Sequence, residues 1–256
     1  MDPATIIGIA VAFVAIWGAM TLEGTHLTSI LLPGPMLLVF VGTIGAGLAG
    51  GMLKDAIHAV KQLPRAFTSK APRQGATIPT LVALSDRARR EGLLALEDET
   101  RDIEDDFLRD GLTAAIDGAD PEELRALLED RIDTKRKQDR IASGFFTSLG
   151  GYAPTIGIIG TVVSLVHVLE NLTEPDSLGP LIAAAFVATL WGILSANMIW
   201  LPLGARLKRL SDLECAQMEV TLEGLLALQS GANPRMVSER LRSLVPASEI
   251  VEDAAA

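Results

Sequence analysis

Three hydroxyl side chains lie deep within the most apolar parts of the chain. Thr161 and Ser164 fall in residues 145–169 and Thr189 falls in residues 178–203, and neither stretch contains Asp, Glu, Lys or Arg. A hydroxyl oxygen accepts hydrogen bonds as well as donating one. Inside a membrane such an oxygen could stabilise a passing cation or a buried carboxylate. The residue types therefore point to a polar path for an ion through apolar surroundings.

Small residues surround these hydroxyls at helical spacing. Gly157, Gly160, Thr161 and Ser164 stand at i, i+3, i+4 and i+7. The second stretch repeats the stripe with Ala185, Ala188, Thr189, Gly192, Ser195 and Ala196, and residues 36–53 carry a less polar version with Gly42, Gly45, Ala46, Ala49 and Gly50. In lipid, helices associate through close approach at such residues. The alternative for all three stripes is helix packing alone, which we favour for residues 36–53.

Long apolar stretches are the elements that must position these side chains. The chain has 256 residues and 49% hydrophobic residues, with a mean hydropathy of +0.34. Residues 4–22, 36–53, 145–169 and 178–203 are each long enough for a helix that crosses about 30 Å of hydrocarbon. A cleavable signal peptide is the alternative for the first stretch, but no basic region precedes it. We therefore expect an all-α, polytopic membrane protein with four transmembrane helices.

Several other classes of function are disfavoured by what the sequence lacks. No HExxH, no phosphate-binding glycine loop and no serine nucleophile with a base is present, so we expect no enzyme, no cofactor and no metal site. The net charge of −10 argues against a nucleic-acid partner. His167 is the nearest titratable group to the hydroxyls, and we expect it at the outer surface beside Glu170. If ions cross here, a partner must supply the carboxylate.

The basic residues indicate the orientation in the membrane. No Lys or Arg precedes Lys54, and none lies between Ile141 and Leu203. Because basic residues stay on the cytoplasmic side, we expect both termini and the block between the second and third spans to be cytoplasmic. The predicted division is residues 1–53 for helices 1 and 2, 54–144 for a helical cytoplasmic domain, 145–203 for helices 3 and 4, and 204–256 for a C-terminal cytoplasmic helix and tail.

The block between the two pairs of spans begins with a linker and continues with helices. Residues 68–79 contain prolines, glycine and small polar residues that break any period. Gly118 is typical of a helix stop, and Asp120 followed by Pro121 and two glutamates is typical of a helix start. The dense charges from Asp86 to Asp110 indicate either a solvated helix face or a docking surface for a charged partner.

At these residues the sequence resembles a known family. The segments GGYAPTIGIIGTVVSLVHVLENL, LGPLIAAAFVATLWGILSANMIWLPLGARLK and ANPRMVSERLRSLVP are similar to the MotA and PomA stator subunits of the bacterial flagellar motor. These belong to the wider superfamily of MotA, TolQ and ExbB ion-channel proteins, and ARREGLLALED is similar to the MotA branch alone. The resemblance implies a multi-pass protein of the bacterial inner membrane. It implies a pentamer around a single-span MotB-type partner whose membrane aspartate carries the ion.

The resemblance also assigns roles to single residues. Thr161 and Thr189 match positions that face the partner aspartate. Pro154 and Pro202 match the prolines that couple ion passage to subunit motion, with a helix start and a helix stop as their alternative interpretations. The family's charged pair facing the rotor protein FliG matches Arg89 and Glu97, and Arg90 adjoins it.

The transported ion and the rotor remain open at this point. A threonine at position 161 occurs in sodium-driven members, whereas the surrounding GIIGTVVSLVHVLENL is closer to proton-driven ones, so we expect H+ before Na+. The alternative function is a TolQ- or ExbB-type energiser of an envelope transport complex. The long soluble block between the second and third spans favours the stator.

Overall fold

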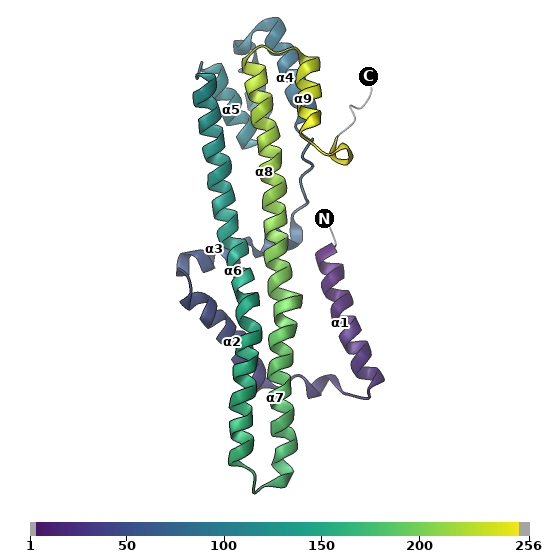
Figure 1. Ribbon diagram of the computed structural model, residues 1–256. Coiled ribbons are helices and arrows are strands. Elements are labelled where there is room, and N and C mark those ends of the chain that lie inside the picture. Colours follow the sequence, from purple (N-terminus) through teal and green to yellow (C-terminus); the bar gives the residue numbers. More distant parts are fainter. Residues whose placement is uncertain (1–3, 251–256) are drawn as a thin grey trace. The chain divides into compact units, whose positions relative to one another are not determined.

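The computed structural model describes residues 4–250, and all regular structure within them is helical (Figure 1). The α-helices are α1 (Ala4–Leu22), α2 (Pro33–Ala49), α3 (Leu53–Thr68), α4 (Ile78–Glu91), α5 (Asp106–Ile116), α6 (Pro121–Glu170), α7 (Pro175–Ser195), α8 (Leu201–Gln229) and α9 (Pro234–Ser243). Short helical turns are η1 (Leu27–Ser29), η2 (Leu93–Leu96), η3 (Glu99–Asp102) and η5 (Ala247–Glu249), and η4 (Ala196–Trp200) is a π-helix. The predicted all-α class is confirmed for the described residues.

The chain forms two compact units, which are described separately. Unit 1 consists of Met1–Lys70 and Asp139–Lys208, and unit 2 of Ala71–Gln138 and Arg209–Ala256. The long helices α6 and α8 contribute residues to both units. The division expected from the sequence differs from this one mainly at α3, which the contacts group with unit 1 and not with the block at residues 54–144.

In unit 1, α6 and α7 form an antiparallel pair joined by residues 171–174 (Figure 1). A buried cluster of Val39, Val187, Trp191 and Leu194 joins α2 to α7. Trp191 Nε1 also donates a hydrogen bond of 2.7 Å to the Ile30 carbonyl. These contacts hold α7, which carries Thr189, against α2.

Unit 2 is built around a leucine core. The helices α4, α5 and α9 pack on the first turns of α6 and the last turns of α8, and the largest fully buried side chains there are Leu81, Leu96, Leu112, Leu124, Leu128, Leu210, Leu225, Leu228 and Leu241. Side-chain caps start two of these helices. Asp105 accepts from the N–H groups of Phe107 and Leu108, and Asn233 accepts from that of Arg235.

The helix boundaries predicted for the middle block are confirmed. Gly118 has φ +85° and follows α5, where the lack of a Cβ makes a left-handed conformation accessible. Asp120 accepts a hydrogen bond of 2.9 Å from the Glu122 N–H, and α6 begins at Pro121. Residues 69–77 lie between α3 and α4 without an α-helix, although the expected linker extends one residue into α3 and two into α4.

Two of the four expected spans are helices that are long and apolar enough to cross a membrane, Pro121–Glu170 and Pro175–Gln229. The other two correspond to shorter apolar helices, Ile6–Leu22 and Pro33–Ala49. The span expected at residues 36–53 ends early, because the chain leaves the helix at Gly50 and Gly51 and a new helix starts at Leu53. Residues 145–203 form two long apolar helices, but these continue far beyond the expected limits.

Candidate functional site

The centre of the α6–α7 contact is a direct approach of two backbones. A methyl group on Gly157 would lie 2.9 Å from the Ala188 carbonyl oxygen and 3.1 Å from Gly192 Cα. A methyl group on Gly192 would lie 2.8 Å from the Ala153 carbonyl oxygen. Backbone atoms cannot swing aside as a flexible side chain can, so only glycine fits at these two positions. The small-residue stripes predicted from the sequence therefore pack α6 on α7.

Beside this contact, two threonine hydroxyls meet across the helix pair. Thr161 on α6 is half-buried, and its Oγ1 contacts Thr189 Oγ1 on α7. The Thr161 hydroxyl also lies 3.0 Å from the Ala185 carbonyl oxygen and 3.2 Å from the Gly157 carbonyl oxygen. The structure brings together the two residues that the family resemblance places on the ion path.

The proton count of this pair leaves acceptor sites open. Each hydroxyl has one proton and two lone pairs. If Thr189 donates to Thr161 and Thr161 donates to the Ala185 carbonyl, both hydroxyl oxygens keep lone-pair capacity. These lone pairs can accept a hydrogen bond from a proton-bearing group or coordinate a cation. The two hydroxyl oxygens can therefore stabilise a positive charge that passes them. Neither threonine is itself titratable.

Ser164 and His167 lie further along α6. Ser164 is half-buried, and within residues 4–250 no hydrogen bond joins it to either threonine. His167 is exposed, and its Nδ1 lies 3.5 Å from Glu170 Oε2 and 3.4 Å from Asn171 Nδ2. The expected neighbourhood of His167 and Glu170 is confirmed. Ser164 remains a prediction for the ion path.

Pro154 lies inside α6 and is not a helix start. A proline has no N–H, so the Gly150 carbonyl four residues earlier loses its helical partner. At Gly150, α6 also approaches the start of α8. A methyl group on Gly150 would lie 2.5 Å from Leu201 Cδ2 and 3.5 Å from the Leu201 nitrogen. The turn weakened by Pro154 therefore faces the residue next to Pro202.

Pro202 is likewise not a helix stop, because α8 runs from Leu201 to Gln229. The helix continues through the π-helix η4, which directly precedes Leu201. A π-turn adds one residue to the helix and occurs often at functional sites. The sequence alone does not predict this π-helix. Its signal in the sequence is Pro202, a second proline after Pro180 in an apolar stretch without Asp, Glu, Lys or Arg.

The residues expected to face a rotor lie at the end of α4 and after it, in unit 2. Arg89 and Glu97 are exposed, and neither forms an ion pair within residues 4–250. Arg90 is different, because it pairs with Asp86 on the same helix, and the neighbouring Arg87 pairs with Glu91 and Glu99. The two residues matched to the family's charged pair are thus the ones whose charges are available to a partner.

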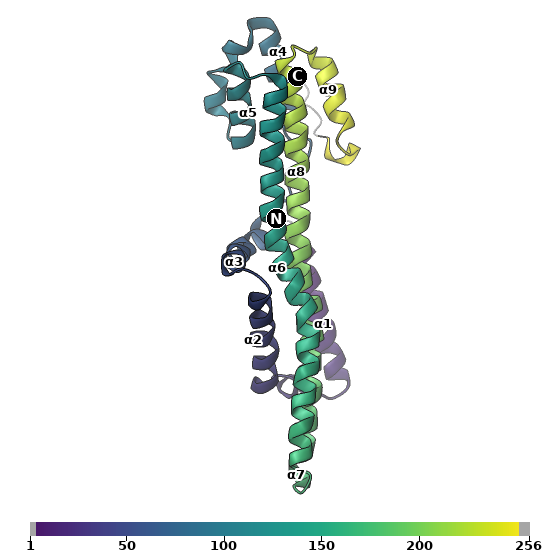
Figure 2. The ribbon, with the colours of Figure 1, turned by 60° about the vertical axis from the view of Figure 1, so that its left-hand side comes forward.

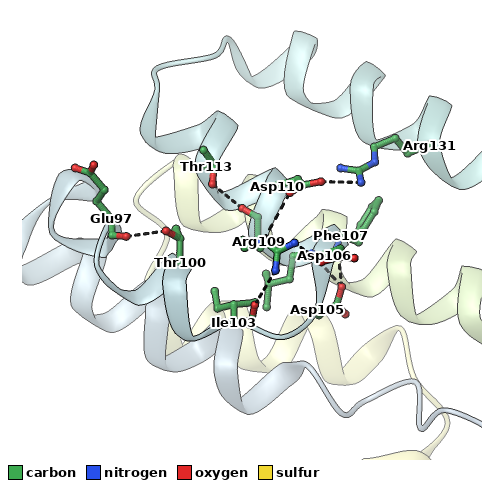
Figure 3. A network of polar contacts seen from close by, with 11 residues as sticks. Glu97, Thr100, Ile103, Asp105, Asp106, Phe107, Arg109, Asp110, Thr113 and Arg131 are labelled. Carbon is green, nitrogen blue, oxygen red and sulfur yellow. Dashed lines mark hydrogen bonds and ion pairs between the residues drawn. The ribbon is translucent and has the colours of Figure 1, made fainter.

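A polar network holds the adjoining surface in shape (Figure 3). Thr100 donates to the Glu97 carbonyl at 2.7 Å, which fixes the turn that carries the Glu97 side chain. Arg109 contacts the Ile103 carbonyl and Asp106, and Arg131 of α6 donates to Asp110 at 2.9 Å. Part of the dense charge between Asp86 and Asp110 is therefore structural.

The chain matches known protein families over most of its length. Residues 6–92 match the family model described as motility protein A N-terminal, and residues 99–220 match the MotA/TolQ/ExbB proton channel family. Motility protein A of Bacillus subtilis is 35% identical over 254 residues, covering 97% of this chain and 93% of that protein. The chemotaxis protein PomA of Vibrio alginolyticus is 33% identical, covering 95% of each.

Solved structures agree with these sequence matches. A structure of MotAB from C. jejuni has a TM-score of 0.92 at 28% identity and covers 96% of this chain and 97% of that one. The flagellar MotAB stator complex from Bacillus subtilis has a TM-score of 0.89 at 35% identity, with 97% and 98% covered. The similarity therefore extends over nearly the whole described fold.

Proposed function

We propose that this chain, which belongs to the motility protein A branch of the MotA/TolQ/ExbB proton channel family, conducts a cation past Thr161 and Thr189 to drive a flagellar rotor. It is a membrane protein and a flagellar stator subunit, not an enzyme. The observation that carries the proposed path is the contact of two hydroxyls beside the Gly157–Gly192 backbone approach. The match of residues 6–92 to the motility protein A model favours a stator over a TolQ- or ExbB-type energiser.

The energies of this path suit conduction. A membrane potential of ~150 mV supplies each monovalent ion with roughly 3.5 kcal/mol, scaled from about 2.3 kcal/mol per 100 mV. A binding site much deeper than that would trap the ion. Hydroxyl contacts in membranes contribute about 0.6 kcal/mol each and at most about 1.7 kcal/mol. Two threonines can therefore lower the barrier without stopping the flow.

The missing carboxylate comes, in this proposal, from a single-span MotB-type partner with a membrane aspartate. Support comes from the similar MotAB complexes and from the two apolar stretches, which contain no acidic residue of their own between positions 145 and 169 or 178 and 203. We further propose a pentamer of this chain around the partner, with Arg89, Arg90 and Glu97 facing the rotor protein FliG.

We propose that the chain crosses the bacterial inner membrane four times, with both termini in the cytoplasm. Helices α1 and α2 would be the first two spans, and α6 and α7 the inner pair. The distribution of Lys and Arg supports this orientation. Reporter fusions after Pro72 and Ala247 should be cytoplasmic, and a fusion within residues 174–179 should be external. An external signal after Pro72 would overturn the orientation.

The coupling ion is the remaining part of the proposal, and we propose H+ with Na+ as the alternative. The direct experiment is to delete the gene, restore it on a plasmid with its partner, and measure swimming speed while the proton and sodium gradients are varied separately. Speed should follow the proton gradient. Speed that follows sodium alone would reverse the ion assignment, and normal swimming of the deletion strain would argue against a stator role.

A further inference from the structure

The outer face of α3 is an exposed apolar stripe. Leu53, Ile57, Val60 and Phe67 are 67%, 48%, 55% and 37% exposed, and Pro64 between them is also exposed. Their spacing of four, three and seven residues places them on one side of the helix. Single exposed apolar residues are ordinary, but a continuous stripe marks a surface that is covered in the assembled molecule.

The stripe cannot turn inward, because another face of α3 already packs against α6 and α8. Ala59 and Ala66 are buried against Phe146 of α6 and Leu207 of α8. Arg65 forms a salt bridge of 2.8 Å with Asp139 of α6, whose side chain is only 7% exposed. These contacts fix the rotation of α3 about its own axis. The stripe therefore keeps facing away from the core.

The course of α3 suggests what covers the stripe. Figures 1 and 2 show α3 running across α6 and not alongside it. Three residues separate it from α2, whose own outward face is apolar at Leu37, Val41, Ile44 and Leu48. Since α6 and α7 are the membrane-crossing candidates, a helix that lies across them and prolongs an apolar surface lies along the membrane plane.

The charges of α3 fit the same surface. Lys54 and Lys61 are exposed and stand three residues before and four residues after Ile57, so both adjoin the stripe on one side. With five charged or titratable residues among its 16, α3 is too polar to cross the membrane. An apolar face beside lysines is the pattern of helices that lie in the interface and attract anionic lipids.

We propose that α3 is an in-plane membrane helix whose stripe enters the headgroup and acyl boundary while Lys54 and Lys61 bind anionic lipid headgroups. The Arg65–Asp139 salt bridge transmits the position of this helix to α6. This inference depends on the membrane location of the chain and not on the ion path, so a failure of one leaves the other intact.

Spin labels test the position of the stripe. The full chain, produced with its partner, is labelled at Ile57→Cys, Val60→Cys or the half-buried opposite-side position Gln62→Cys, and reconstituted into phosphatidylcholine vesicles containing phosphatidylglycerol. The unsubstituted chain measures background labelling of the buried Cys215. Labels at 57 and 60 should be accessible to oxygen and shielded from a water-soluble nickel chelate, unlike the label at 62.

Two results would overturn the position. Nickel access at 57 and 60 equal to that at 62 would place the stripe in water. Immobilised labels shielded from both reagents would show that a protein surface covers it, whether a second copy or another partner.

The lipid charge preference is tested with brominated lipids. In a Val60→Trp variant, brominated phosphatidylglycerol should quench the added fluorescence more than brominated phosphatidylcholine, after subtraction of the signal of the unsubstituted chain. Lys54→Gln with Lys61→Gln should reduce the preference by about fivefold per lysine, and replacing both by Arg should retain it. Equal quenching by both lipids, or no change on removing the lysines, would refute the anionic-lipid part.

Discussion

The two units pack their helices in different ways. In unit 1, α6 meets α7 through backbone atoms, with Gly157 against Ala188 and Gly192. In unit 2, the corresponding close approach at Gly111 is to the side-chain ends of Leu225 and Leu128. The first contact has no side chain that can move. The second is surrounded by leucines that can change rotamer.

This difference separates two sources of helix packing energy, the closeness of the backbones and the apolar area that is buried. Membrane helices gain little from apolar burial, so the α6–α7 contact depends on how close the backbones come. The core of unit 2 depends on the apolar area that its leucines bury. Equal substitutions should therefore have unequal effects in the two units, and glycine positions test this directly.

The largest effect is expected for Gly157→Ala. Its methyl group meets a backbone oxygen and a Cα at 2.9 and 3.1 Å, so α6 and α7 must separate. We expect loss of the Thr161–Thr189 contact, a marked fall in thermal stability of the detergent-solubilised complex, and loss of motility. Gly111→Ala should cost less, in the range of about 1–3 kcal/mol for an overpacked core.

Gly151→Ala is the matched control on the same helix. A methyl group there has nothing within 4 Å in this chain, and alanine is the better helix former by up to about 1 kcal/mol. Its stability should equal or exceed that of the unsubstituted protein. If Gly157→Ala were no worse than Gly111→Ala, the backbone approach would not be the determinant of the α6–α7 contact.

The next largest effect is expected on ion flux. Thr189→Val keeps the shape of the side chain and removes the oxygen that contacts Thr161. A hydroxyl contribution of about 0.6–1.7 kcal/mol to the barrier corresponds to a fall in flux of about three- to twentyfold. Torque under load and proton flux into vesicles would measure it, with complex assembly unchanged.

Thr155→Val provides the control for this substitution. Its hydroxyl donates to the Tyr152 carbonyl of its own helix, and the side chain is exposed. We expect near-normal flux from it, and a milder loss from Thr161→Ala than from Thr189→Val. If the Thr189→Val variant produced full torque, the hydroxyl pair would have no part in conduction and would only pack the two helices.

Local features of the chain were predictable from the sequence. The start of α6 follows from the Asp120 cap and Pro121, and the end of α5 from Gly118, because these depend on neighbouring residues alone. The two inner apolar helices follow from their composition. The pairing of Thr161 with Thr189 could be anticipated only through the family resemblance, since spacing cannot align two helices.

Long-range features were not predictable from the sequence. Whether Pro154 and Pro202 end helices or lie within them depends on the surrounding packing, and the approach of Gly150 to Leu201 and the π-helix η4 decide it. Glu223 joins Arg125 and Arg240 from two other helices. No local pattern shows which of the 32 acidic residues will find such partners.

A smaller effect, confined to unit 2, is expected from Glu223. Burial raises the pKa of Glu223, but hydrogen bonds from Arg240 and Arg125 outweigh it and hold the pKa below its usual value. A lowered carboxyl pKa stabilises the fold above the unfolded-state pKa and loses that contribution as pH falls through the folded-state pKa. The melting temperature should therefore fall as the pH drops below about 4.5, the ordinary glutamate pKa.

Substitution separates this contribution from general acid unfolding. Glu223→Gln should lower stability at neutral pH by about 1 kcal/mol, because both arginines are partly solvated, and should flatten the acid limb of the melting curve. Glu129→Gln is the control, since its 3.5 Å contact with Arg125 is exposed. Equal acid limbs for Glu223→Gln and the unsubstituted chain would exclude Glu223 as the group responsible.

The smallest effect is expected from single charges on the outer surface of unit 2. An exposed ion pair contributes about 0.2–1 kcal/mol, so neutral substitution of Arg89 or Glu97 should change swimming speed little. Reversal of both, Arg89→Glu with Glu97→Lys, should slow swimming while membrane insertion stays normal. A compensating reversal on the rotor should restore part of the speed.

Arg90→Glu discriminates a docking surface from a merely charged one. Arg90 pairs with Asp86, so its reversal places two acids one turn apart and should slightly weaken α4 through like-charge repulsion. A compensating charge on the rotor cannot repair that repulsion. If a compensating charge on the rotor restores swimming speed only for the Arg89 and Glu97 reversals, these two residues are the contacts. Unchanged torque after reversal of all three charges would show that this surface faces solvent and does not dock the rotor.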